Sequence, residues 1–390
     1  MEEISVDGEG PRSGYPERLL HPVTRASAPD RHFQDGGPPL DALAQPVCLD
    51  LAPRRLAPGL AVHPLGLGCR SIGSDMTPHA VPDSEWLDGM RSAVEHGANL
   101  FDVADTYGDG RAERLLGQVV GEYGRQGVTL KISSKVGHRG TAPHPYAGPH
   151  LRHQLEQSLE NLNVEQLDLF ALPSHDFGPG DRYLGPAVEV LRAMKDFGTI
   201  GAIGLVGPSS GPAATPSAGG HARFDELFAL IQPDVVMLPF NALTPLALLP
   251  GGGKGELISR LADSDTGVLL TSPLAGGLLA GAVSCRNRLP APRNETRNVI
   301  ARVLAPLRER LGGHPAVLGQ AALRYCLSRG RGTAVVAGFG RADHVMLNYG
   351  CLGLDLSPED EAAVEAAYAT LREELQLTRP EVVRQSTAAG

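Results

Sequence analysis

An aspartate, a tyrosine and a lysine stand at the ends of two hydrophobic runs of this sequence. Asp102 and Tyr107 lie in the segment Phe-Asp-Val-Ala-Asp-Thr-Tyr-Gly, and Lys135 ends the next run. A phenol has an ordinary pKa of about 10, so it donates poorly to a developing alkoxide unless a nearby ammonium favours its ionised form. A buried lysine needs a counter-charge to stay protonated, and Asp102 would supply it. We therefore predict a catalytic set of Asp102, Tyr107 and Lys135, with Tyr107 as the general acid.

These side chains need a scaffold that brings strand ends together, and the hydrophobic runs predict one. Eight short runs rich in Val, Ile, Leu and Phe occur at 65–68, 100–104, 130–136, 167–172, 202–206, 235–240, 268–270 and 334–337. Their continuous hydrophobicity is typical of parallel strands that are covered on both faces. Each run precedes a stretch with helical spacing. We therefore predict an α/β fold, a single-domain (β/α)8 TIM barrel whose catalytic groups sit where the strands end.

The N-terminal segment differs in composition from the rest of the chain. Residues 1–46 contain seven prolines and show no helical or strand periodicity, so we expect a flexible N-terminal extension. The barrel is predicted to occupy residues 47–378. Within it, Val47–Leu51 and Leu60–His63 are expected to pair as a hairpin across the barrel floor.

The C-terminal region carries the signal of one further helix. Ser357-Pro358-Glu359-Asp360 combines a cap hydroxyl, a proline suited to the first helical position and carboxylates near the positive end of a helix. This pattern predicts an added outer helix, followed by a short tail at 379–390.

Charge and composition exclude several classes of protein. The 390 residues are 42% hydrophobic and 20% charged, which suffices for a large packed core. A net charge of −9 without a long basic run argues against a nucleic-acid partner. The five cysteines lack metal-ligand spacing and predict reduced thiols with no metal site. The first residues have no apolar stretch flanked by Lys or Arg, so we expect no membrane association and a cytoplasmic location.

The motif that contains Asp102 and Tyr107, together with Ser-Lys-Val-Gly at Lys135, resembles the signature of the aldo-keto reductases. Further segments match in the same order at 110–113, 198–204 and 240–241. The resemblance extends from about Leu65 to the helix after Ser357. It implies an NADPH-dependent oxidoreductase that reduces an aldehyde or ketone, or oxidises the corresponding alcohol. Hydride would be transferred between cofactor and substrate, with Tyr107 as proton donor.

The resemblance also implies a cofactor site at the ends of the last two barrel strands. The pyrophosphate side is matched by Ser272, Leu274 and Gly276. The adenosine side is matched by Gly338, Gly340, Arg341, His344 and Asn348. Helix N-terminal amides attract phosphate, and glycines let the backbone approach it closely. The forked guanidinium of Arg341 suits a 2′-phosphate, which favours NADP over NAD.

One position departs clearly from the family's pattern. In Asp-Leu-Phe-Ala-Leu-Pro-Ser-His-Asp, residues 168–176, Pro173 stands where the family has a catalytic histidine. Proline cannot donate a hydrogen bond. His175 would reach the site only if the loop bends. Two nicotinamide contacts of the family are also altered, since the chain has Val206-Gly207 and Met237 at those positions.

Three interpretations stay open at this point. The leading one is carbonyl reduction with a small-molecule carbonyl or alcohol as the substrate. A redox-inactive binding or regulatory protein on the same barrel is the second, as the related potassium-channel β-subunits suggest. A non-redox acid–base enzyme that uses Tyr107 and Lys135 is the third. The substrate itself depends on variable loops, here 137–148 and 177–184, and the oligomeric state is equally open.

Overall fold

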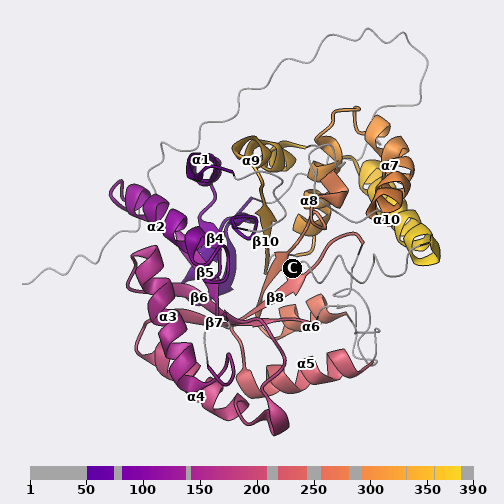
Figure 1. Ribbon diagram of the computed structural model, residues 1–390. Helices are drawn as coiled ribbons and strands as arrows, with labels where there is room; N and C mark the ends of the chain where they lie inside the picture. The colour runs from indigo at the N-terminus through magenta and orange to yellow at the C-terminus, as the bar shows by residue number, and fades with distance from the viewer. Residues whose placement is uncertain are drawn as a thin grey trace, which may run out of the picture. The chain divides into compact units, whose positions relative to one another are not determined.

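The computed structural model describes residues 51–73, 81–137, 142–208, 218–243, 256–280, 292–330, 332–354 and 356–378. Within these ranges, eight parallel strands close into a barrel that is surrounded by helices (Figure 1). The predicted (β/α)8 barrel is therefore confirmed. The predicted extension at 1–46 and the tail at 379–390 lie outside the described residues.

The barrel strands agree closely with the predicted hydrophobic runs. They are β3 (Leu65–Gly68), β4 (Leu100–Asp102), β5 (Lys131–Lys135), β6 (Leu167–Leu172), β7 (Ile200–Val206), β8 (Val235–Pro239), β9 (Gly267–Thr271) and β10 (Thr333–Gly338). Each strand pairs with its neighbours in chain order, and β10 closes the barrel on β3. Because all pairs are parallel, the carboxyl ends of the eight strands meet at one end of the barrel.

Helices cover the outside of the barrel (Figure 1). They are α1 (Asp83–Glu95), α2 (Arg111–Gly124), α3 (Gly148–Leu162), α4 (Leu184–Asp196), α5 (Ala218–Ile231), α6 (Leu257–Asp263), α7 (Pro292–Arg310), α8 (Val317–Leu327), α9 (Ala342–Tyr349) and α10 (Pro358–Thr378), with short 3₁₀ turns at η3 (Pro179–Asp181), η5 (Leu278–Ala280) and η6 (Gly350–Gly353). No helix in the described part of the chain has the length and apolar character needed to span a membrane.

The added C-terminal helix is α10, and it packs against α7. It begins at the predicted position, because Ser357 Oγ accepts a hydrogen bond from the Asp360 backbone N–H at 3.1 Å. This bond satisfies one of the amides that a helix leaves unpaired at its first turn. The serine and proline at this position therefore start the helix as the sequence indicates.

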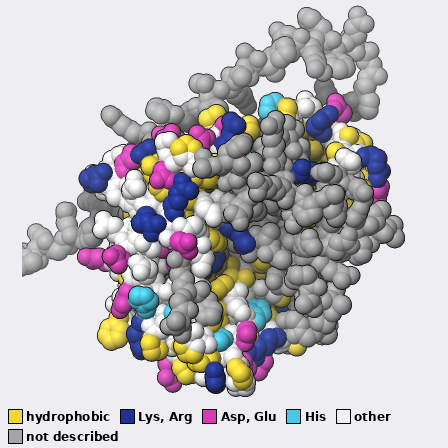
Figure 2. Space-filling view, in the orientation of Figure 1, with side chains coloured by type: hydrophobic (Ala, Val, Ile, Leu, Met, Phe, Trp, Pro, Cys, Tyr) yellow, Lys and Arg dark blue, Asp and Glu magenta, His cyan; other side chains and the backbone are white. Residues whose placement is uncertain are grey.

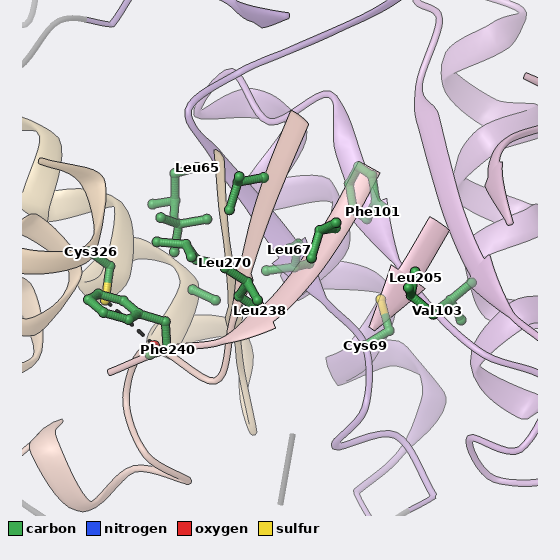
Figure 3. Packing of buried hydrophobic residues seen from close by; sticks show 14 of the residues in the cluster. Leu65, Leu67, Cys69, Phe101, Val103, Leu205, Leu238, Phe240, Leu270 and Cys326 are labelled. Atoms are coloured by element: carbon green, nitrogen blue, oxygen red, sulfur yellow. Dashed lines mark hydrogen bonds between the residues drawn. The ribbon is translucent and has the colours of Figure 1, made fainter. Parts of the chain in front are cut away.

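The side chains of the strands alternate between two hydrophobic clusters, as a pleated strand requires. The inner cluster holds Leu100, Leu169, Ala171, Ala202, Val235, Met237, Leu269, Ala334 and Val336. The outer cluster packs between strands and helices and includes Leu65, Leu67, Phe101, Leu205, Leu238 and Leu270 (Figure 3). Two positions beyond the inner-facing Leu100 and Ala171 stand Asp102 and Pro173. The alternation therefore directs both toward the barrel interior.

The inner cluster is closed below by a hairpin of β1 (Arg54–Ala57) and β2 (Leu60–Val62). A Cβ on Gly267 would lie 2.1 Å from the Leu56 carbonyl oxygen, so the hairpin backbone rests directly on the start of β9. Residues 47–50 of the predicted first strand, Val47–Leu51, lie outside the described residues, and Leu51 is in no strand. The predicted pairing is corrected, because the partner of β2 is Arg54–Ala57. The tight turn after Ala57 requires the first strand to end immediately before it.

Candidate active site

Asp102 and Lys135 form an ion pair at the carboxyl ends of β4 and β5. Lys135 Nζ lies 2.7 Å from each carboxylate oxygen of Asp102 and donates to the Val103 carbonyl oxygen at 3.2 Å. The exposed fractions of the two side chains are 13% for Lys135 and 8% for Asp102. Ser133 Oγ donates a further hydrogen bond to Asp102 Oδ1 at 2.8 Å. The counter-charge that a buried lysine needs is therefore in direct contact with it.

Tyr107 stands beside this ion pair, with its ring centroid 5.5 Å from Lys135 Nζ. Burial lowers the pKa of Lys135, but attraction to Asp102 and Tyr107 and hydrogen bonds to both raise it, and the net pKa lies above its ordinary value. The ammonium is therefore charged at neutral pH. A charged ammonium next to a phenol stabilises the phenolate that remains after proton donation.

The turn after β4 gives Tyr107 its place. Gly110 N–H donates to the Asp105 carbonyl oxygen at 2.7 Å, and residues 108–110 all have positive φ, which two glycines adopt without steric cost. The loop after β5 lies directly against this turn, since a Cβ on Gly137 would lie 2.3 Å from Asp105 Oδ1. Tyr107 is thus held on a compact turn at the barrel end.

Pro173 directly follows β6 and continues the inward alternation of Leu169 and Ala171. It is exposed, whereas Leu172 before it is fully buried. Ala171 pairs with Lys135 in the register of β5 and β6. The position predicted for the family's histidine therefore lies directly after the strand that pairs with β5 at Lys135, and its proline ring offers no donor.

His175 is turned to a different partner. Its Nε2 lies 2.7 Å from the Val206 carbonyl oxygen, and its ring packs against Phe224. Because a carbonyl oxygen only accepts, Nε2 must carry the proton in this hydrogen bond. Burial lowers the pKa of His175, so the imidazole is neutral at neutral pH. In this arrangement the Nε2 proton is not available to a substrate carbonyl.

Tyr146 holds the chain directly after Pro173, and the sequence did not single it out. Its hydroxyl accepts a hydrogen bond from Ser174 N–H at 2.7 Å and donates one to the Ser174 carbonyl oxygen at 2.9 Å. The side chain is fully buried and packs against Phe177, with ring centroids 4.6 Å apart. The contact joins two loops 28 residues apart, so no local spacing reveals it.

Tyr146→Phe is expected to lower the free energy of unfolding by about 1–3 kcal/mol, because the ring stays while both Ser174 backbone groups lose their partner. Chemical denaturation measures the change. Tyr123→Phe is a matched control, since the Tyr123 hydroxyl makes only a 3.5 Å hydrogen bond to the Arg91 carbonyl oxygen on the outer helices. Equal destabilisation by the two substitutions would show that the Tyr146 hydroxyl does not hold the loop.

The predicted pyrophosphate-side residues lie in the turns between β9 and η5. Ser272 and Ala275 have φ values of 58° and 50°, which non-glycine residues rarely adopt and which cluster at ligand sites. Asn241 Nδ2 donates to the Ser272 carbonyl oxygen at 3.2 Å and so ties this loop to the end of β8. Leu274 is partly buried and Gly276 is exposed.

The predicted adenosine-side residues lie at the end of β10 and on α9. Asn348 Nδ2 donates to the Gly338 carbonyl oxygen at 3.1 Å, and Gly340 N–H donates to His344 Nδ1 at 3.3 Å. These bonds fold the loop back onto its helix. Arg341 precedes α9, and 63% of its side chain is exposed. The two predicted halves of the cofactor site therefore follow adjacent barrel strands.

The surface near the centre of the barrel is mixed in character. Hydrophobic side chains lie around the centre of the face in Figure 2, with Lys or Arg and His side chains beside them. Among the residues that the structure describes, no three His, Cys, Asp or Glu side chains form a metal-binding group.

Comparison with known proteins identifies the family. The model of the aldo/keto reductase family matches residues 64–369 of the chain. A probable voltage-gated potassium channel subunit beta of Arabidopsis thaliana is 26% identical over 277 residues, covering 66% of this chain and 79% of the relative. Pyridoxal reductase of the same plant is 26% identical over 324 residues, covering 79% and 84%.

A solved structure shares the fold. The aldo/keto reductase of Klebsiella pneumoniae, crystallised in complex with NADP and acetate, superposes with a TM-score of 0.55 at 22% sequence identity. The match covers 81% of this chain and 95% of that one.

Proposed function

Because the chain belongs to the aldo/keto reductase family, we propose that it is an oxidoreductase that reduces an aldehyde or ketone, or oxidises the corresponding alcohol, with a nicotinamide cofactor. The observation that carries the proposal is the buried Asp102–Lys135 ion pair beside the Tyr107 ring. Such a pair is costly to bury, and its ammonium lies beside the Tyr107 phenol. This is the arrangement that a phenolic proton donor needs.

The residues divide the work as follows. Tyr107 donates its hydroxyl proton to the carbonyl oxygen of the substrate, and Lys135 stabilises the phenolate that results. Asp102 keeps Lys135 charged and fixes its position through two hydrogen bonds. When bound, the nicotinamide supplies the hydride that is added to the carbonyl carbon. In the direction of alcohol oxidation, the Tyr107 phenolate accepts the hydroxyl proton.

The loops after β9 and β10 fit a dinucleotide. The unusual backbone at Ser272 and Ala275 and the exposed Gly338 offer peptide groups to a phosphate at close range. Arg341 is exposed enough to reach an adenosine phosphate. We propose NADPH as the preferred cofactor, supported by Arg341 and by the NADP bound to the related Klebsiella pneumoniae enzyme.

Arg341→Ala is expected to weaken NADPH binding about tenfold or more, because a hydrogen bond to a charged group contributes about 1.5–3 kcal/mol. NADH lacks the 2′-phosphate and should bind with nearly unchanged affinity. Fluorescence titration measures both dissociation constants. Arg308→Ala, which removes another exposed arginine that pairs with Glu309 on α7, is the control. Equal weakening of NADPH and NADH binding would show that Arg341 does not contact the 2′-phosphate.

The proposed function is tested by titrating the purified chain with NADPH and then offering a panel of aldehydes and ketones. Oxidation of bound NADPH by any member of the panel supports it. Pro173 and the resemblance to a potassium-channel subunit favour a second candidate, a redox-inactive regulatory protein. That candidate predicts tight cofactor binding without turnover. A chain that binds neither NADPH nor NADH would contradict both.

A further inference from the structure

Asp343, in the first turn of α9, binds the guanidinium that a 2′-phosphate would need. Arg341 Nη2 donates to Asp343 Oδ2 at 2.9 Å, and Arg341 Nε donates to Asp343 Oδ1 at 3.2 Å. Two parallel hydrogen bonds to two oxygens form the fork with which arginine also binds phosphate. The carboxylate of Asp343 therefore engages the donors that Arg341 would offer to NADPH.

A second carboxylate lies at the same end of the helix. The Ala342 N–H donates to Glu85 Oε1 of α1 at 2.8 Å, and Ala342 is the first residue of α9. The carboxylates of Asp343 and Glu85 thus both lie at the start of α9, next to Arg341, where the sequence predicts a doubly charged phosphate. These carboxylates repel the 2′-phosphate of NADPH. The ribose 2′-hydroxyl of NADH is uncharged and can donate a hydrogen bond to a carboxylate.

We propose that Asp343 determines cofactor choice in this chain, an inference that rests on the proposed function. Asp343 competes with the 2′-phosphate of NADPH for Arg341 and accepts a hydrogen bond from the 2′-hydroxyl of NADH. The preference for NADPH that Arg341 confers is thereby reduced, and the chain accepts both cofactors. Both side chains are about half exposed or more, at 63% and 50%, so they can change partners without repacking the core.

Asp343→Asn tests the proposal directly, since it removes the charge and keeps the shape. NADPH should bind about tenfold more tightly, because the fork of Arg341 is released and a repelling charge is lost. NADH should bind equally or more weakly. Both dissociation constants are measured by fluorescence titration at one low ionic strength, because salt screens exposed charges. Asp88→Asn is the matched control, as Asp88 pairs with Arg91 on α1 at 3.2 Å.

A double-mutant cycle with Arg341→Ala separates competition from simple repulsion. If Asp343 acts through Arg341, the gain in NADPH affinity from Asp343→Asn should shrink to less than about threefold when the chain already carries Arg341→Ala. A full gain without the guanidinium, or an unchanged ratio of the two affinities in Asp343→Asn, would overturn the proposal. Failure of the unmodified chain to bind either cofactor would instead contradict the proposed function.

Discussion

Tyr107→Phe is expected to lower turnover by about 10² to 10⁴, because general acid catalysis contributes a factor of that size. The phenyl ring can keep its place beside Lys135, so the substitution removes only the hydroxyl that donates the proton. The affinity for NADPH should change little, since the predicted nucleotide contacts follow β9 and β10. Steady-state kinetics with an aldehyde and fluorescence titration with NADPH measure the two effects separately.

Two further variants test whether the loss of turnover comes from the Tyr107 hydroxyl. Lys135→Met should lower turnover similarly, because the phenolate loses its neighbouring charge. It also leaves Asp102 buried without its ion-pair partner, so its unfolding free energy must be compared with that of Tyr107→Phe. Tyr123→Phe removes a hydroxyl from the outer helices and should leave turnover unchanged. A Tyr107→Phe variant that keeps most of its activity would exclude Tyr107 as the proton donor.

The fold could be predicted from the sequence because each barrel strand is buried on both faces. Such strands appear in the sequence as continuous hydrophobic runs. One example is the run 167–172, and β6 has the predicted bounds. The floor hairpin was predicted less well. β1 begins with Arg54 and Arg55, so the sequence shows no hydrophobic run there, although Arg54 is buried at 5% exposure. A charged side chain in a floor strand gives no hydrophobic signal, so the hydrophobic pattern predicts the first strand several residues before Arg54–Ala57.

The site could be predicted only as far as local motifs reach. Asp102 and Lys135 end the neighbouring strands β4 and β5, and Tyr107 follows β4, so parallel pairing brings the three together. The partners of Tyr146 and His175 lie 28 and 31 residues away along the chain. Their hydrogen bonds depend on how loops fold over one another, which neither periodicity nor propensity specifies. The same limit applies to Glu85 and Ala342, which are 257 residues apart.

The loop after Pro173 is held at several points, which makes this position suitable for substitution. Ser174 is bonded to Tyr146 through both its N–H and its carbonyl oxygen. Arg223 of α5 donates to the His175 carbonyl oxygen at 3.3 Å and to Asp181 Oδ1 at 2.5 Å. These contacts do not involve the proline ring. A new side chain at position 173 would therefore stand on a backbone that its neighbours already fix.

Pro173→His is expected to accelerate the reduction of generic aldehydes by up to about 10², because loss of one donor to the reacting oxygen typically lowers a rate by about 10² to 10³. The imidazole would continue the inward alternation of Leu169 and Ala171, directly after the strand that pairs with β5 at Lys135. Pro173→Ala is the control, since it removes the ring without adding a donor, and kcat/KM for a series of aldehydes is the measurement. An equal gain in the Ala variant would assign the effect to the backbone. If the His variant folds and binds NADPH yet reduces no carbonyl faster than the unmodified chain, a missing donor does not limit the reaction, and the redox-inactive candidate becomes the better account of Pro173.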